Sequence, residues 1–341
     1  MSRSELTPAE RLKVFIKYLS AFACAAIGGF RIARVVAEPG VTIVAYHRII
    51  DDDYVGVRPY ISVTKGALRR QIQFFKKHYS VIPLEEAVER IEEDHIDRHY
   101  LVITFDDGYR DNYDLGLDIF VSECVRPAIF ITTGCVESRQ ELWPDTIRNA
   151  LYGARFSAPI ALREPEITIN PKLSSRIRAT KAIIAHVKNM DSEQRSLYLN
   201  ALQQRLRSPP AGDRLMLSWD EVQSLSRVGV TVGSHTVSHQ VLARVDERTA
   251  GVEIGDSKRI LEARTGSRVA FFAYPNGTSA DFTDSTIDEL KKAGYSAAVT
   301  TIRGVNRNGA DVFRLRRTGI YLTDTLNVIK FKLAAESFLR G

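Results

Sequence analysis

Short apolar runs alternate along most of the chain with segments whose apolar residues recur at helical spacing. The runs are rich in β-branched and aromatic residues, a composition that predicts buried strands. We expect strands at 41–47, 80–84, 100–105, 126–132, 230–235, 268–275, 295–300 and 313–320.

The segments between these runs predict amphipathic helices. The first follows Thr64, whose hydroxyl is suited to cap a helix N-terminus. We expect the others at 84–93, 112–121, 218–229, 246–264 and 282–294, with a closing amphipathic helix at 324–339. Repeated strand–helix units imply a parallel sheet, and their number favours a barrel over an open sheet. The predicted fold class is therefore α/β, a distorted (β/α) barrel.

Residues 143–215 interrupt this alternation with helical stretches such as 174–190 and 192–206. We interpret them as a helical insertion within a catalytic domain that spans 41–322. A C-terminal amphipathic helix occupies 323–341, and residues 1–40 form a separate basic and apolar segment.

An apolar, uncharged run lies between Lys17 and Arg31, and it is shorter than the ~20 residues that a transmembrane helix needs. Arg3, Arg11 and Lys13 precede it, as in a signal peptide, but no clear cleavage site follows. An uncleaved helix on a membrane surface fits better, and a helix packed on the catalytic domain is the equal alternative. We expect residues 1–38 to bind a membrane surface, and a cytoplasmic or membrane-associated protein rather than a secreted one.

Composition limits the classes of partner. The hydrophobic fraction of 44% and the charged fraction of 26% are those of a soluble globular protein. The net charge of +6 suits anionic membranes or acidic glycans. No nucleic-acid-binding motif occurs, so we expect no nucleic acid partner. The three cysteines, Cys24, Cys124 and Cys135, match no zinc or redox spacing, and we expect free thiols.

Candidate chemistry begins where the strand 100–105 ends, with Asp106, Asp107 and Gly108. In β/α barrels the reactive residues lie at the C-terminal ends of the strands. Adjacent carboxylates point in different directions, so one can bind a metal while the other moves a proton. The tripeptide alone is also an ordinary turn.

His235 and His239 directly follow the strand 230–235. On a helical turn, residues four apart share a face, so both imidazoles can reach one cation. With Asp107 they form a two-histidine, one-carboxylate set that leaves positions open for water and substrate. The alternative is a pair of solvent-facing loop histidines. Dinucleotide, Walker, HExxH and GxSxG motifs are missing, which leaves hydrolysis by metal-activated water.

Three motifs together resemble the polysaccharide deacetylase family, the NodB-homology group of carbohydrate esterases. They are TFDDGYRDN (104–112), SHTVSH (234–239) and FAYPNG (272–277), in the family's order and at similar separations. LSWDEV and ELWPD add to the resemblance, which covers roughly residues 41–320. The resemblance implies the NodB-type distorted β/α barrel, in agreement with the alternation.

The resemblance also implies roles for individual residues. Asp106 would be the general base, and Asp107, His235 and His239 would bind a divalent metal, commonly Zn²⁺. The backbone N–H of Asn276 would help to bind the oxyanion of the tetrahedral intermediate. The residues implied in substrate binding are Tyr109, Trp143, Tyr274, Pro275 and Arg317.

This chain departs from the family pattern at two positions. Ala273 stands where many members have an arginine that steadies the base, and Asn276 where many have tyrosine. Arg316 or Arg317 could supply the missing positive charge, or both could be surface arginines on a strand edge.

The general acid is the least defined role, because no histidine follows His239. Only His47, among the remaining histidines, follows a buried strand, and VAYHRI resembles the YHRI element of a family branch with rearranged strand order. The resemblance implies that His47 is the acid, while a core histidine is the alternative.

The implied reaction is removal of acetyl groups from N-acetylated sugars of the N-acetylglucosamine type, by a hydrolase of carbon–nitrogen bonds other than peptide bonds. A metal hydrolase of O-acetyl esters or of a non-sugar amide would use the same residues. A phosphatase of the aspartyl-phosphate type would need a second aspartate where Gly108 stands. A non-catalytic glycan-binding protein is a further alternative.

Overall fold

The computed structural model describes residues 16, 18–23, 28–54, 60–138, 141–208 and 212–338. The chain divides into two compact units. The larger comprises Lys17–Glu137 and Leu215–Gly341, and the smaller is built mainly by Ser138–Arg214. Most of the N-terminal segment to which we assign membrane binding lies outside the described residues.

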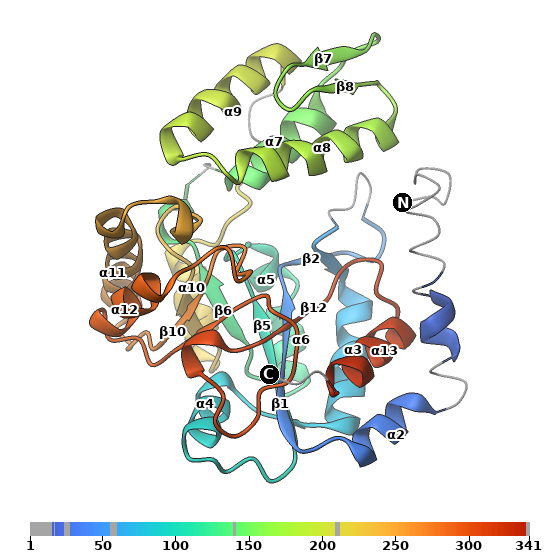
Figure 1. Cartoon of the computed structure of the whole chain (residues 1–341), viewed down its shortest axis with the longest axis vertical. Helices are drawn as coiled ribbons and strands as arrows, with labels where there is room; N and C mark the ends of the chain where they lie inside the picture. The colour runs from blue at the N-terminus through green and yellow to red at the C-terminus, as the bar shows by residue number, and fades with distance from the viewer. Residues whose placement is uncertain are drawn as a thin grey trace. The chain divides into compact units, whose positions relative to one another are not determined.

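The larger unit is built on a parallel sheet with strand order β11-β10-β9-β6-β5-β1-β12 (Figure 1). A short extra strand, β4, pairs with the first half of β5. The bounds are β1 Gly40–Tyr46, β4 Ser80–Val81, β5 His99–Phe105, β6 Ala128–Ile131, β9 Thr231–Ser234, β10 Phe271–Ala273, β11 Ala297–Val299 and β12 Thr318–Gly319.

The segment 315–319 joins the two edges of this sheet. Its first residue, Leu315, forms a parallel bridge with Val299 of β11. Three residues later, Thr318 pairs with Val44 of β1 at the opposite edge. The sheet therefore curls on itself, and the predicted distorted (β/α) barrel is confirmed.

Side chains of the strands alternate between two hydrophobic clusters, as the period of two in a strand requires. One cluster includes Val44, Ile103 and Phe272 and packs against the surrounding helices. The other includes Ile43 and Phe130 and fills the interior, together with apolar residues of α4.

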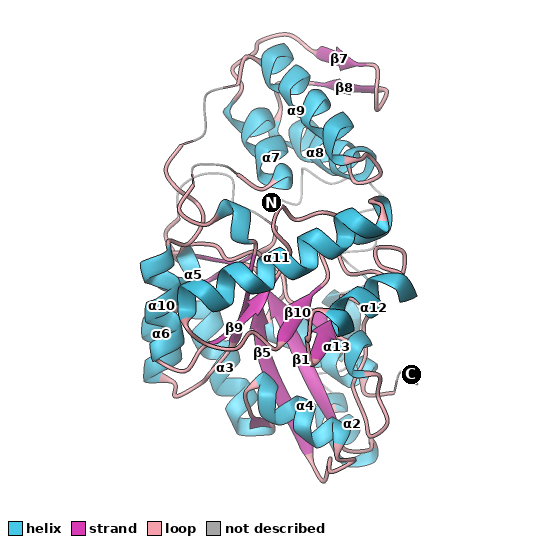
Figure 2. Cartoon of the chain, turned by 90° about the vertical axis from the view of Figure 1, so that its left-hand side faces the viewer, coloured by secondary structure: helices cyan, strands magenta, loops and turns pink. Residues whose placement is uncertain are grey.

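Figure 2 shows the helices of this unit on the outside of its strands. Their bounds are α2 Gly29–Val36, α3 Lys65–His78, α4 Leu84–Glu92, α5 Asp111–Asp114, α6 Leu117–Ser122, α10 Trp219–Arg227, α11 Glu247–Thr265, α12 Asp284–Lys292 and α13 Leu326–Glu336. The predicted N-cap of α3 is confirmed, because the Thr64 side chain accepts a hydrogen bond from the Ala67 amide. Within the described ranges, no helix is long and apolar enough to span a bilayer.

The smaller unit has its own hydrophobic core, formed by residues such as Ile147, Ala179, Ile183 and Leu202. Its helices are α7 Trp143–Gly153, α8 Leu173–Val187 and α9 Ser192–Leu206. An antiparallel hairpin of β7 Ile160–Leu162 and β8 Ile167–Ile169 accompanies them. The interpretation of this region as purely helical missed the hairpin, because each of its strands is only three residues long.

Two local expectations were wrong, and one pair of strands was missed. The helix expected at 112–121 is two short helices that are separated near Gly116, where an added Cβ atom would lie 2.4 Å from the carbonyl oxygen of Asn112. The strand expected at 313–320 shrinks to β12, preceded by a 3₁₀ turn at Val312–Arg314. A short parallel pair, β2 Arg48–Ile50 and β3 Ser62–Thr64, was not predicted.

Cys124 is exposed and Cys135 is buried, and Cys24 lies outside the described residues.

Candidate active site

The candidate catalytic residues follow strands of the barrel at their C-terminal ends. His47 comes after β1, Asp106 and Asp107 after β5, His235 after β9, and Asn276 three residues beyond β10. Parallel strands present these ends at one edge of the sheet, so residues distant in sequence converge there.

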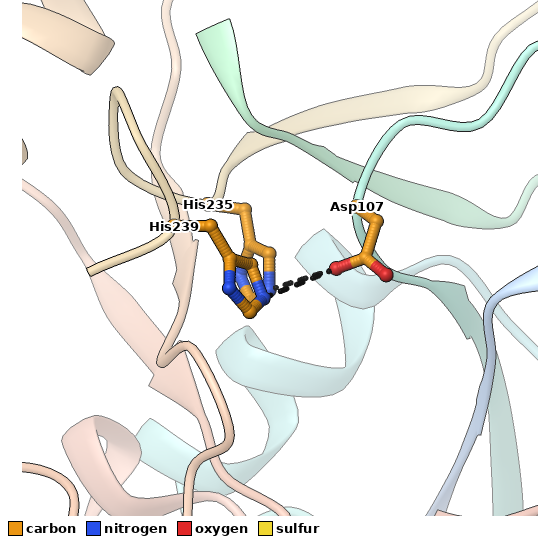
Figure 3. A group of neighbouring side chains, drawn as sticks. All are labelled: Asp107, His235 and His239. Carbon is orange, nitrogen blue, oxygen red and sulfur yellow. Dashed lines mark ion pairs between the residues drawn. The ribbon is translucent and has the colours of Figure 1, made fainter. Parts of the chain in front are cut away.

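Asp107, His235 and His239 form one buried cluster (Figure 3). The Asp107 Oδ1 atom lies 3.3 Å from His235 Nε2 and 3.4 Å from His239 Nε2. Each residue offers one ligand atom, and these atoms all lie within 4.8 Å of one another. Two imidazole nitrogens and one carboxylate oxygen suit Zn²⁺ and related divalent metals, and three protein ligands leave positions open. The donor set therefore fits a catalytic metal.

A second contact fixes the tautomer of His235. Its Nδ1 atom lies 2.7 Å from the carbonyl oxygen of Ala273. A carbonyl oxygen can only accept, so Nδ1 carries the proton and, in the neutral ring, the lone pair is on Nε2. Nε2 is the nitrogen that faces Asp107, as a metal ligand requires.

The loop that carries both histidines is not the helical turn expected from their spacing. Thr236 and His239 have left-handed backbone conformations, with φ of 67° and 58°. For a β-branched residue such as threonine this conformation is strained, and such strain persists only where the surroundings impose it. The two imidazoles thus converge through an irregular loop, which a spacing rule for helices could not describe.

Glu253 of α11 holds this loop in place. Its carboxylate accepts hydrogen bonds from the backbone amides of Val237 and Ser238, at 2.8 and 2.9 Å, and from the Ser238 hydroxyl at 2.6 Å. We missed this residue from the sequence, because it lies in the middle of an unremarkable helix pattern.

The turn after β5 gives the two aspartates different surroundings. Asp107 and Gly108 both have positive φ, 78° and 82°, and a Cβ atom at Gly108 would lie 3.2 Å from the Ile131 side chain. Burial raises the pKa of Asp107, but hydrogen bonds from the protonated rings of His235 and His239 outweigh it and leave that pKa well below its ordinary value. Asp107 is therefore anionic, as a carboxylate ligand of a metal must be.

Asp106 instead pairs with Arg317. The two guanidinium nitrogens each lie 2.7 Å from one carboxylate oxygen of Asp106, and both side chains are almost fully buried. Burial raises the pKa of Asp106, but the Arg317 charge and its hydrogen bonds outweigh that effect and lower the pKa overall. The base candidate is thus held ionised.

Arg317, and not Arg316, supplies the charge that is missing at Ala273. Its Nε atom donates to the carbonyl oxygen of Thr300 at 2.7 Å. The side chain has no exposed surface, so we assign it to positioning Asp106 rather than to binding substrate, which corrects the expectation from the motifs. The Arg316 side chain bonds to the carbonyl oxygen of Arg303 instead.

His47 is held by its backbone beside the two aspartates. The Asn112 amide donates to the His47 carbonyl oxygen at 2.8 Å. The His47 Nδ1 atom is buried and has no hydrogen-bond partner within the described part of the chain. Its charge is among those that lower the pKa of Asp106 and of Asp107, in each case after burial and the larger pairing contacts.

Asp111 holds the two residues that follow His47. Its carboxylate accepts hydrogen bonds from Arg48 Nε at 2.8 Å and from the Ile49 amide at 2.9 Å. Both supporting residues, Asp111 and Asn112, lie in the motif 104–112, which could have signalled them.

Tyr274 was expected to bind substrate but belongs to the core. Its hydroxyl donates to the carbonyl oxygen of Phe313 at 2.9 Å, and its ring stacks on Phe282 with centroids 4.1 Å apart. The neighbouring Pro275 is also buried. Both residues directly follow the end of strand β10, and both are buried in the protein.

The other residues expected to bind substrate or the oxyanion have different surroundings. Tyr109 is buried, with the Arg48 guanidinium 5.0 Å from its ring centroid. Trp143 starts α7 in the smaller unit, where the Arg195 guanidinium lies 5.1 Å from its ring. Their roles in substrate binding stay predictions. Asn276 has φ of 61°, and its buried side-chain Nδ2 atom has no hydrogen-bond partner in the described ranges.

The family model described as polysaccharide deacetylase matches residues 173–298. This range includes the motifs SHTVSH and FAYPNG and starts after TFDDGYRDN. This segment of the chain is similar to the polysaccharide deacetylase family. The match confirms the family resemblance drawn from the motifs, while the N-terminal histidine element lies outside it and stays a prediction.

A protein of Bacillus subtilis (strain 168), named "Putative polysaccharide deacetylase YxkH", is 23% identical over 109 residues. These residues cover 32% of this chain and 38% of YxkH, so the match spans less than two thirds of that relative.

Solved structures share the fold over most of this chain. The Streptococcus pyogenes deacetylase PplD in complex with acetate has a TM-score of 0.58 at 16% identity, and the match covers 88% of this chain and 99% of PplD. IcaB from Ammonifex degensii has a TM-score of 0.57 at 16% identity, covering 88% and 98%. A de-N-acetylase from Aggregatibacter actinomycetemcomitans has a TM-score of 0.55 at 15% identity, covering 86% and 99%.

Replacement of His235 or His239 by alanine should abolish metal binding and activity together, because either change removes one of three ligands. Elemental analysis of the purified variants checks this expectation. Asp106→Asn is the matched control, which should keep its metal and lose most of its rate. Full metal content in either alanine variant would contradict the ligand assignment.

Arg317→Met should lower the free energy of unfolding by about 3–5 kcal/mol, because it leaves the Asp106 carboxylate buried without its partner. Urea unfolding measures the loss, with Arg316→Met as the control at the neighbouring position. The double variant Asp106→Asn with Arg317→Met should regain part of this stability but none of the activity. Equal stability of the two single arginine variants would refute the assignment.

Proposed function

We propose that this protein removes acetyl groups from N-acetylated sugars in a metal-dependent hydrolysis. The observation that carries the proposal is the pair of adjacent buried carboxylates with separate partners. Asp107 faces two histidines, and Asp106 faces an arginine. A ligand and a base side by side are what hydrolysis by an activated water requires.

The names of the relatives support the same reaction class. PplD is called a deacetylase and YxkH a putative polysaccharide deacetylase, and the protein from Aggregatibacter actinomycetemcomitans is called a de-N-acetylase. We propose the N-acetylglucosamine type of sugar, within a polysaccharide, an oligosaccharide or a lipid-linked glycan.

The residues of the chain divide the proposed reaction between them. A divalent metal held by Asp107, His235 and His239 would supply Lewis acidity for water and for the acetyl carbonyl. Asp106 accepts the proton from the attacking water, with its orientation set by Arg317. The backbone N–H of Asn276 donates to the developing oxyanion. His47 protonates the departing amine nitrogen, and the products are acetate and a free amino sugar.

Ester hydrolysis is the alternative reaction that uses the same groups. Acetate release from matched N-acetyl and O-acetyl sugars, with and without a chelator, tests the proposal. The proposal predicts release from the N-acetyl sugars that the chelator abolishes. Release from esters alone would favour the alternative, and binding of the sugars without any release would favour a glycan-binding protein.

His47→Ala should bind metal normally and lose amide hydrolysis by roughly two to four orders of magnitude, the usual contribution of general acid catalysis. The loss should be smaller for an ester, whose leaving group needs less protonation than an amine. Steady-state rates on a matched amide and ester measure this difference, with the exposed His95→Ala as control. Equal losses on both substrates would assign His47 a structural role.

We also propose that the N-terminal region binds an anionic membrane surface. Phe30 and Ala33 anchor one face of α2, while Val35 on the opposite face is 86% exposed and Val36, at the end of the helix, is 67% exposed. The exposed Arg31 lies on the same helix, so apolar and cationic groups occur together, as in interfacial helices.

The substitution Val35→Asp should weaken binding to the membrane, because it places a negative charge within the exposed apolar face of α2. Co-sedimentation with vesicles of phosphatidylcholine and phosphatidylserine measures the effect, and vesicles of phosphatidylcholine alone should bind less of the unmodified protein. Val252→Asp, at an exposed valine of α11, is the matched control. Equal binding of both variants would contradict the proposal.

A further inference from the structure

Two tyrosines belong to segments that pair with the chain on the two sides of the end of β1, the strand that His47 follows, and the proposed chemistry uses neither. On one side, β12 pairs with β1, and the Ile320 amide donates to the Ala45 carbonyl oxygen at 2.9 Å. Tyr321 is the next residue. On the other side, the Arg48 amide donates to the Ile61 carbonyl oxygen at 3.3 Å, and Tyr60 is the residue before Ile61.

The two tyrosine rings are stacked on each other. Their centroids are 4.7 Å apart, and the ring planes differ by 17°. The Leu322 amide donates to the Tyr60 carbonyl oxygen at 3.1 Å, which ties the two segments together through the backbone. Lys332 Nζ lies 5.0 Å from the Tyr321 centroid. Contacts on the Tyr321 side therefore support the stack.

Tyr60 is the open member of this stack. One face of its ring contacts Tyr321, and half of the residue, 50%, is exposed to solvent. Burial raises the pKa of Tyr321, and Asp106 and Arg317 are among the charged groups that modify it. The charges of Asp106 and Arg317 thus act on the Tyr321 side of the stack.

We propose that Tyr60, supported by Tyr321, is an aromatic platform for the sugar ring that carries the departing amine. The proposal rests on the proposed deacetylation, in which the amine leaves next to His47. The C–H face of a pyranose ring is apolar, and its hydrogens complement the negative face of an aromatic ring. Ligand sites combine such aromatic surfaces with a few polar groups.

The platform would make the site selective for sugars over small acyclic amides. Tyr60 would contribute to binding of the ring and not to the proton transfers, so its loss should act on KM. Because the Tyr60 ring is already stacked on Tyr321, it loses little conformational freedom when the sugar binds, which favours affinity.

The test compares Tyr60→Ala and Tyr60→Phe with the unmodified protein on a penta-N-acetylglucosamine substrate, in its β-1,4-linked and β-1,6-linked forms. Tyr60→Ala should raise KM about fivefold to thirtyfold with kcat within about twofold, and Tyr60→Phe should retain a KM close to that of the unmodified protein. On N-acetylethanolamine, which has no sugar ring, Tyr60→Ala should change nothing. Phe338→Ala is the control, since Phe338 is similarly exposed, at 56%.

Binding without turnover separates this inference from the proposed reaction. In the Asp106→Asn background, calorimetry with the same pentasaccharides should give a Kd that rises by a similar factor on Tyr60→Ala. An unchanged KM and Kd, an equal loss on N-acetylethanolamine, or no binding of either pentasaccharide would overturn the platform. Binding that depends on Tyr60, without acetate release by the unmodified protein, would support the platform and refute the deacetylation.

Discussion

The short segment 315–319 joins the two edges of the curled sheet, and the arrangement of the candidate active site depends on this closure. Leu315 contacts β11 and Thr318 contacts β1, so Arg317 lies between the two edges. From there its guanidinium reaches Asp106 at the end of β5. Barrel closure and orientation of the base thus come from one segment, and a change in its register would alter both.

Two neighbouring carboxylates in one buried place would repel each other if both were ionised without partners. In this chain each carboxylate has its own positively charged or hydrogen-donating partner, which reduces the repulsion. Asp106 accepts two hydrogen bonds from a permanent cation, while Asp107 faces two imidazoles that can exchange a proton for a metal. These separate partners suit the two carboxylates to different roles. Asp106 is kept ionised by Arg317 and does not need the metal, while Asp107 remains available to bind it.

Much of this arrangement could be predicted from the sequence, because strand ends are visible as the points where apolar runs stop. The convergence of Asp107, His235 and His239 follows from that rule and from parallel strands. The choice between Arg316 and Arg317 does not follow, because side chains alternate along a strand and β12 is too short to show which residue points inward. The contribution of Glu253 could not be predicted for another reason, since its contacts join a helix to loop residues fifteen and sixteen positions away in the sequence.

Three of the loops that carry the candidate site share one form of support. They are fixed by carboxylates from outside the reacting set: Asp111 for the end of β1, Glu253 for the histidine loop, and Asp281 for the turn after β10, where it accepts from the Thr278 amide. These loops include strained residues such as Thr236, and backbone amides without regular pairing. A carboxylate satisfies several such donors at once and resists their rearrangement. Groups that are already oriented before the substrate binds need no reorganisation as charge develops, and this preorganisation is the main electrostatic source of catalysis. We therefore expect these carboxylates to contribute to the proposed chemistry although they lie outside the candidate metal ligands and base.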